Sequence, residues 1–285
     1  MIGRPEQLRI DVGDGLAVHV TRVGTGPPLL LLHGFTGSAD TWTPLRESLG
    51  DRYTTIAPDF AGHGRSDAPH DPSRYALSRF ADDLVIILDT LGVQRTAALG
   101  YSMGGRAALS FALAHGDRIA ALVLESASPG ITDPTERAVR VESDADLAAS
   151  IERDGVARFV ARWERLPLWE SQTALPSTVR TRLHAQRLRN HATGLANSLR
   201  GAGAGAEGPV LDRLRGHTTP TLLIAGALDA KYVALAGLME SMMPRSQLAI
   251  VPAAGHATHL EHPAEFSRIV AHFLDTVAAE TGQWR

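Results

Sequence analysis

The pentapeptide at residues 100–104, Gly-Tyr-Ser-Met-Gly, constrains the fold of this chain more than any other feature. A short apolar segment, 96–99, precedes it, and an alanine-rich segment of good helix formers, 106–114, follows it. The pattern predicts that Ser102 lies on a sharp turn between a strand and a helix, with its hydroxyl exposed and with glycines where other backbone passes closely. The alternative is a glycine-rich helix start with a capping serine, and the rest of the chain favours a nucleophile or base.

Apolar segments of strand length alternate with helical periodicity along most of the chain. Residues 7–23 alternate around Gly13-Asp14-Gly15 and predict an antiparallel hairpin. We expect further strands at 28–32, 54–59, 96–99, 121–124, 220–225 and 247–251, and helices at 74–91, 106–114, 233–243 and 263–279. This alternation predicts an α/β fold with a mostly parallel central sheet flanked by helices.

One segment, residues 131–215, departs from this alternation because its pattern is helical and contains no convincing strand. We therefore expect a core formed by residues 1–130 and 216–285, with residues 131–215 inserted as a helical cap. The alternating glycines and alanines at 201–206 predict a flexible stretch near the return to the core.

The composition excludes several classes of function. The 285-residue chain has a formal net charge of −3, which gives no electrostatic reason to expect nucleic acid or an anionic membrane as a partner. It has no cysteine, so disulfides, thiolate metal sites and cysteine nucleophiles are excluded. No metal-ligand spacing, phosphate loop or dinucleotide fingerprint is present, and we expect no metal and no cofactor. The N-terminus lacks the apolar core of a signal peptide, and no apolar run could span a bilayer, so we expect a cytoplasmic enzyme.

Three residues in the order Ser, acid, His predict a catalytic triad. Ser102 follows one strand, Asp229 follows the strand at 220–225, and His256 follows the strand at 247–251. Open α/β sheets place their sites at the carboxyl ends of such strands. A serine hydroxyl needs a base to take its proton, and that base needs a third group to hold its tautomer.

Other residues could take two of these roles. Glu125 also follows a strand and is an alternative acid, although we expect it to be a hydrogen-bonded structural carboxylate. His259 and His262 lie near His256, but they are further from the strand and are interpreted as loop or helix-start residues.

An oxyanion hole needs two backbone N–H groups. We expect one from Met103, at the start of the helix after the nucleophile, and the other from Phe35, in the loop 33–37. The alternative for that loop is a glycine turn with a core phenylalanine. A further loop, 59–66, is expected to give structural support near the site.

Two cations lie beside the predicted triad. Arg106 comes four residues after Ser102, on the same helix face, and suggests a carboxylate in the substrate. The alternative is a structural pair between this arginine and an acid. Lys231 is the only lysine in the chain and lies two residues after Asp229. We weigh a functional role of this lysine and its placement there by chance equally.

The motifs together resemble those of the α/β-hydrolase superfamily over nearly the whole chain. The segments that carry this resemblance are 32–38, 62–64, 100–104 and 255–256. Finer features resemble the 2-succinyl-6-hydroxy-2,4-cyclohexadiene-1-carboxylate synthases of the menaquinone pathway, namely the segments 100–106, 124–130 and 229–232. Tyrosine and arginine beside the serine are more specific than the Gly-x-Ser-x-Gly pattern alone.

This resemblance implies a carbon–oxygen lyase on an α/β-hydrolase fold. The substrate would be 2-succinyl-5-enolpyruvyl-6-hydroxy-3-cyclohexene-1-carboxylate, a small polycarboxylate that loses pyruvate. Ser102, made basic by His256 and Asp229, would remove a ring proton, and the amides of Phe35 and Met103 would hold the developing enolate. No acyl-enzyme would form.

The resemblance also implies the substrate-binding residues. These are Tyr101, Arg106, Arg137, Arg140, Trp163, Arg187 and Lys231. Two departures from the family pattern are Phe60-Ala61, in place of a more usual leucine-rich pair, and Ala227, where many members have an acid. The rival functions are a serine hydrolase of esters or carbon–carbon bonds and a non-catalytic ligand receptor.

Overall fold

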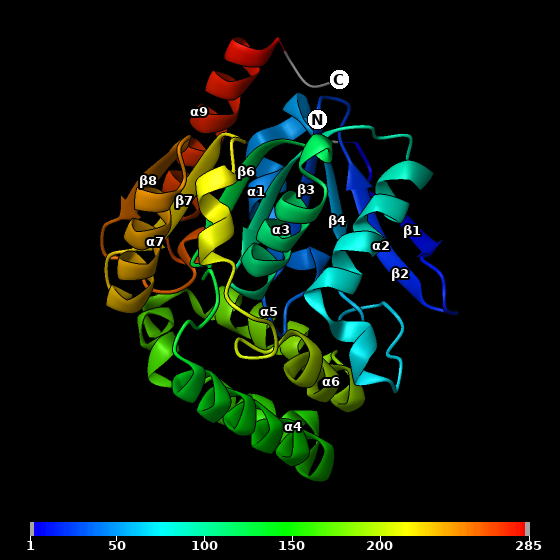
Figure 1. Cartoon of the computed structure of the whole chain (residues 1–285). Coiled ribbons are helices and arrows are strands. Elements are labelled where there is room, and N and C mark those ends of the chain that lie inside the picture. The colour runs from blue at the N-terminus through cyan, green and yellow to red at the C-terminus, as the bar shows by residue number, and fades with distance from the viewer. Residues whose placement is uncertain (1–2, 283–285) are drawn as a thin grey trace.

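A computed structural model describes residues 3–282 and shows a twisted eight-stranded sheet (Figure 1). The strands are β1 (Glu6–Asp11), β2 (Ala17–Val23), β3 (Pro28–Leu32), β4 (Thr54–Pro58), β5 (Thr96–Tyr101), β6 (Ile119–Glu125), β7 (Thr221–Gly226) and β8 (Ser246–Val251). Their order is β1-β2-β4-β3-β5-β6-β7-β8. β2 runs antiparallel to β1 and β4, and the other neighbours are parallel. The predicted hairpin and the mostly parallel sheet are confirmed.

Helices cover both faces of the sheet. One face carries α2 (Leu77–Thr90), α3 (Met103–Ala114) and α7 (Ala230–Met242), and the other carries α1 (Thr43–Leu49) and α9 (Pro263–Thr281). In β3, Leu30 and Leu32 pack toward the α2–α3 face, and Leu29 and Leu31 pack toward the α1–α9 face. All four leucines are fully buried, which explains why β3 is a continuous apolar run rather than an alternating one.

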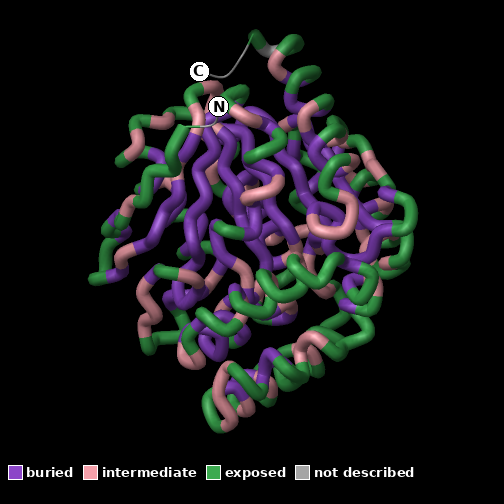
Figure 2. Tube along the Cα trace, turned by 180° about the vertical axis from the view of Figure 1, so that it is seen from behind, coloured by how far each residue is buried: buried purple, intermediate pink, exposed green. Residues whose placement is uncertain are grey.

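Three further helices lie together at one end of the sheet, between β6 and β7 in the sequence (Figure 1). They are α4 (Pro134–Trp163), α5 (Ser177–Leu188) and α6 (Ala192–Ala202). Apolar side chains of α4 and α6 form a small cluster of their own, which includes Ile151, Phe159 and Leu195. The outer side of α4 is largely exposed (Figure 2), and the helix bends at Gly155, where φ is 81°.

Some local details differ from the predictions, and helices α3 and α7 each begin three residues earlier than expected. The helix predicted from residue 74 begins at Leu77, because Asp71 caps a separate short turn at Pro72–Tyr75. Helix α1 was not predicted. The stretch 201–206 is not simply a flexible linker, since α6 continues to Ala202. Gly203 then packs so closely on α4 that a Cβ there would lie 2.6 Å from an Asp144 carboxylate oxygen.

None of the helices within residues 3–282 is both long enough and apolar enough to cross a membrane.

Candidate active site

The turn at Ser102 has the backbone geometry that the pentapeptide predicts. Ser102 has φ 53° and ψ −110°, and its N–H donates to the carbonyl of Glu125 at 2.8 Å. A Cβ on Gly104 would collide with the carbonyl oxygen of Leu32, so glycine is required where α3 approaches the end of β3. The Ser102 side chain makes no capping hydrogen bond to α3, which rules out the alternative of a capping serine.

The structure brings the three predicted triad residues together. His256 Nε2 lies 3.1 Å from Ser102 Oγ, and His256 Nδ1 lies 2.7 Å from an Asp229 carboxylate oxygen. A carboxylate only accepts hydrogen bonds, so the proton on the imidazole is assigned to Nδ1 and Nε2 is free to accept from the serine. Asp229 also caps α7 by accepting from the amide of Tyr232, which holds its carboxylate in place. Such an arrangement can move a proton from Ser102 to His256.

A cavity of about 150 Å³ lies over Ser102. It is formed by the ends of the core strands together with α4, α6, α7 and the segment Pro167–Ala174. The predicted site residues that line it are Phe35, Tyr101, Ser102, Met103, Arg106, Arg140, Trp163 and His256. Residues that lie more than a hundred positions apart in the sequence therefore line the same cavity.

Phe35 and Met103 both reach this cavity. The N–H of Met103 belongs to the first turn of α3 and has no acceptor within its helix. The N–H of Phe35 donates no hydrogen bond to any acceptor within residues 3–282. Two free amides beside a serine are what an oxyanion hole requires. The Phe35 ring packs edge-on against Trp163, at 5.5 Å between centroids, so this phenylalanine is part of the cavity wall.

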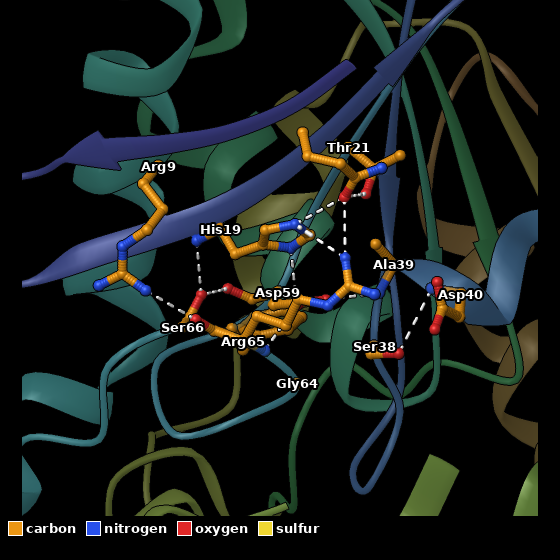
Figure 3. Close-up of polar contacts among 12 residues, drawn as sticks. Arg9, His19, Thr21, Ser38, Ala39, Asp40, Asp59, Gly64, Arg65 and Ser66 are labelled. Atoms are coloured by element: carbon orange, nitrogen blue, oxygen red, sulfur yellow. Dashed lines mark hydrogen bonds and ion pairs between the residues drawn. The ribbon is translucent and has the colours of Figure 1, made fainter. Parts of the chain in front are cut away.

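A polar cluster around the buried Asp59 holds the segment that follows β3 and the loop 59–66 (Figure 3). Asp59, at the end of β4, accepts from the amide of Ala39 at 2.6 Å, the amide of Arg65 at 2.9 Å and Nδ1 of His19 at 2.9 Å. Burial by itself raises the pKa of Asp59, but these hydrogen bonds and the nearby His33 bring it below its usual value. The cluster ties the loop after β3 and the loop 59–66 to β2, which agrees with the supporting role expected for 59–66.

Arg106 lies on the cavity wall and contacts the end of α6. Its guanidinium donates to the carbonyls of Ala202 at 2.6 Å and Gly203 at 3.1 Å. No carboxylate within the described chain forms an ion pair with it. Burial lowers the pKa of Arg106, although an arginine remains charged at any ordinary pH. The anticipated alternative, a structural arginine–acid pair, is therefore not what the structure shows.

The other predicted cations are arranged differently. Arg140 lines the cavity and pairs with Asp144 at 2.9 Å. Arg187 lies outside it, beside a neighbouring hollow of about 380 Å³, where it pairs with Glu164 at 2.9 Å. Arg137 and Lys231 are exposed, and neither lines the cavity over Ser102.

The cavity also has lining residues that were not predicted as site residues, and two of them lie against the imidazole of His256. Trp169 lines both the cavity over Ser102 and the neighbouring hollow, and its ring lies 5.6 Å from that of His256. Tyr232 lines the cavity from α7, with its ring 4.5 Å from His256. Tyr232 belongs to the segment 229–232, which carries the resemblance to the synthases, and this was the signal that could have identified it.

Glu125 is fully buried and hydrogen-bonded, as expected of a structural carboxylate. It accepts from the hydroxyl of Thr258 at 2.6 Å, and its other oxygen lies 2.8 Å from Nδ1 of His259. In the part of the chain that the structure describes, no hydrogen bond or ion pair joins Glu125 to His256, and the carboxylate that contacts the triad imidazole is that of Asp229. Within residues 3–282 no group of three or more His, Asp or Glu side chains could hold a metal ion.

Comparison with known proteins gives the family. The family described as alpha/beta hydrolase fold matches residues 27–263. A putative 2-succinyl-6-hydroxy-2,4-cyclohexadiene-1-carboxylate synthase from Bacillus subtilis (strain 168) is 43% identical over 272 residues, which cover 95% of this chain and 99% of the relative. The chain belongs to the 2-succinyl-6-hydroxy-2,4-cyclohexadiene-1-carboxylate synthase family of α/β-hydrolases.

Solved structures agree with this family. The structure of MenH from S. aureus matches with a TM-score of 0.85 and 34% identity, covering 90% of this chain and 96% of that one. A thermophilic esterase from Thermogutta terrifontis has a TM-score of 0.84 and 27% identity, covering 95% and 99% of the two chains. The α/β-hydrolase fold and the resemblance to the synthases, both predicted from the motifs, are confirmed.

Proposed function

We propose that this chain is a lyase that eliminates pyruvate from 2-succinyl-5-enolpyruvyl-6-hydroxy-3-cyclohexene-1-carboxylate to give 2-succinyl-6-hydroxy-2,4-cyclohexadiene-1-carboxylate. The observation that carries the proposal is a Ser–His–Asp triad in one cavity with Arg106, whose guanidinium has no carboxylate partner in the described chain. The similarity to the synthase of Bacillus subtilis over 95% of the chain gives the same reaction.

The reaction needs a base, and the triad can supply one. Ser102 would pass its proton to His256 Nε2 and remove the ring proton next to the succinyl ketone. The electron pair would move through the ketone to form an enolate, which the amides of Phe35 and Met103 would stabilise. Return of that electron pair through the ring breaks the carbon–oxygen bond to the enolpyruvyl group, which leaves and takes up a proton as pyruvate. Because Ser102 only exchanges protons, no covalent intermediate is needed.

The charges of the substrate fit the walls of the cavity. A polycarboxylate needs converging cations, and arginine suits a planar carboxylate. Arg106 and Arg140 lie in the cavity itself, and Arg187 lies beyond Trp169, where a longer arm of the substrate would reach. We therefore assign substrate binding first to these three arginines, and we propose that residues 131–215 act as the cap over the site. A cytoplasmic location stays a prediction from the sequence.

The second candidate is ester hydrolysis, favoured by the similarity to the Thermogutta terrifontis esterase. The same triad could attack a carbonyl carbon and form an acyl-enzyme. The difference between the two functions lies in the arginines, because a neutral ester has no carboxylate for Arg106 to bind.

The test supplies the purified protein with the enolpyruvyl cyclohexene substrate and follows pyruvate release. The expected result is turnover of this substrate by the wild type and a loss of about a hundredfold in kcat/KM for Arg106→Ala. Hydrolysis of a small neutral ester should fall far less. Arg268→Ala is the matched control, since Arg268 is exposed and pairs with Glu265 on α9, away from the cavity lining. Failure of the wild type to release pyruvate, with rapid ester hydrolysis instead, would favour the esterase.

A further inference from the structure

Tyr232 lines the cavity over Ser102 but has no role in the triad or the predicted oxyanion hole. We propose that Tyr232 is a substrate-positioning residue, whose hydroxyl donates a hydrogen bond to the same substrate carboxylate that Arg106 binds. This inference rests on the proposed function, because it needs a substrate that bears a carboxylate.

The position of Tyr232 is held by the triad itself. Its backbone N–H donates to Asp229 Oδ1 at 3.4 Å, in the first turn of α7. Its ring meets the imidazole of His256 at 63°, with 4.5 Å between the ring centroids. The tyrosine is therefore fixed at both its backbone and its ring, and its hydroxyl has a defined place relative to Ser102.

The hydroxyl of Tyr232 has no partner, unlike that of two other tyrosines. Tyr75 donates to the carbonyl of Pro69 at 2.8 Å, and Tyr53 donates to Asp275 at 3.2 Å. No acceptor within residues 3–282 is hydrogen-bonded to the Tyr232 hydroxyl. Tyr232 is half-buried, and its hydroxyl is not one of the fully buried polar atoms without a partner, so it is open to the cavity that the residue lines. A bound ligand with an acceptor oxygen can therefore reach this hydroxyl and accept its hydrogen bond.

Arg106 and Tyr232 both line the cavity over Ser102. The positive field of Arg106 acts on Tyr232, although burial is the larger influence and raises the pKa of the phenol, so that it remains a donor. Two of the five guanidinium N–H groups of Arg106 are used on the carbonyls of α6, which leaves others for a ligand. Arg140, in contrast, already has Asp144 as its counter-ion. Arg106 and Tyr232 together thus offer a cation and a neutral donor, which suit the two oxygens of one carboxylate.

The test is Tyr232→Phe, which removes one oxygen that has no hydrogen-bond partner among the residues that the structure describes. We expect KM for the enolpyruvyl substrate to rise about tenfold while kcat changes less than about threefold, because the lost hydrogen bond is to a charged group. Succinate serves as a probe that does not depend on turnover. The concentration of succinate that protects Ser102 from a neutral phosphonate should also rise about tenfold.

A double-mutant cycle with Arg106→Lys asks whether the two residues bind the same group. The combined loss should be clearly smaller than the product of the two single losses. Tyr53→Phe is the matched control, since it removes the same oxygen far from the cavity and should leave kcat/KM unchanged.

The outcomes separate this inference from the proposed function. Wild-type protein that releases no pyruvate contradicts the proposed function, and succinate protection then still shows whether Tyr232 binds a carboxylate. Wild-type turnover together with unchanged KM and unchanged succinate protection in Tyr232→Phe would overturn the role of Tyr232. Independent, multiplicative losses in the double mutant would show that the two residues bind different groups, and would also overturn it.

Discussion

Two histidines that lie three residues apart after β8, namely His256 and, on the short helix α8 (Thr258–Glu261), His259, each form a pair with a carboxylate, and the two pairs are chemically almost identical. In one, His256 Nδ1 lies 2.7 Å from Asp229, and in the other, His259 Nδ1 lies 2.8 Å from Glu125. The difference is what the second imidazole nitrogen faces. Nε2 of His256 meets the Ser102 hydroxyl in a cavity, whereas Nε2 of His259 is buried and has no hydrogen-bond partner among residues 3–282. Access to a reacting group, and not the pair itself, makes one of them suitable for catalysis.

We call His259 and Glu125 the closed pair, and His256 and Asp229 the open pair. The closed pair supports the open pair. The carboxylate of Glu125 accepts from the hydroxyl of Thr258 and the amide of His259, and the carbonyl of Glu125 accepts from the amide of Ser102. One residue at the end of β6 therefore holds both the nucleophile turn and the loop that carries His256. Substitutions in the open pair should therefore lower the catalytic rate, whereas substitutions in the closed pair should lower the free energy of unfolding.

The largest effect should come from the open pair. His256→Ala should lower kcat/KM for pyruvate release by about 10⁵-fold, because Ser102 loses the group that takes its proton. The free energy of unfolding should change little by comparison. Pyruvate release followed in a coupled assay measures the rate, and urea denaturation measures the stability. A His256→Ala enzyme within tenfold of the wild type would remove His256 from the mechanism.

The next effect should come from the carboxylate of the same pair. Asp229→Asn should lower the rate by about 10³- to 10⁴-fold, since an amide in this place can favour the wrong imidazole tautomer. The pH–rate profile of the variant, compared with the wild type, measures this effect. Equal rates for the two proteins would show that the tautomer does not depend on Asp229.

The closed pair should give a smaller effect of a different kind. Glu125→Gln should reduce the free energy of unfolding by about 3 kcal/mol, because it leaves a buried imidazole without its carboxylate. The rate per folded molecule should stay within about tenfold of the wild type. Urea denaturation with Glu265→Gln, an exposed acid on α9, as the control measures the difference. A loss of activity as large as that of Asp229→Asn, without a loss of stability, would make Glu125 a member of the catalytic group.

A third pair, His19 and Asp59 beneath the loop after β3, should give the smallest effect, and it depends on pH. The pKa of Asp59 lies below its ordinary value of 3.8, so its stabilising contribution is complete above that value and is lost as the pH falls through the folded-state pKa. Between about pH 5 and pH 2 the stability of the wild type should therefore fall more steeply than that of Asp59→Asn. Urea denaturation at several pH values measures the slopes, and parallel slopes would contradict the lowered pKa.

Much of the fold could be predicted because its signals are local. The continuous leucines of β3 indicate a strand that is buried on both faces of the sheet. The alternation of residues 7–23 indicates strands that are buried on one face. Both predictions follow from the spacing of apolar residues. The short helix α1 and the start of α2 could not be predicted, because capping by Asp71 and packing against α9 decide their limits. The order of Ser102, Asp229 and His256 was also visible, since each follows a strand of one sheet.

Lys231 and Tyr232 show where local signals end. The sequence directs attention to the lysine, which is unusual in composition, but Lys231 is exposed and Tyr232 lines the cavity. Which residue of the first turn of α7 points inward depends on how that helix packs beside β7, and neighbouring helical residues face different directions. Arg137 and Arg187 likewise lie outside the cavity over Ser102, because the packing of α4 and α5 decides where their long side chains reach.

The amino-acid sequence by itself determined the parallel sheet, the strained turn at Ser102 and the family, because spacing, glycine and short motifs act over a few neighbouring residues. Only the tertiary structure decided which histidine meets the serine in an open cavity and which is sealed, and that Arg106 contacts the end of α6 instead of an acid. These are contacts between residues about a hundred or more positions apart. They depend on how whole helices and strands pack, which no short stretch of sequence encodes.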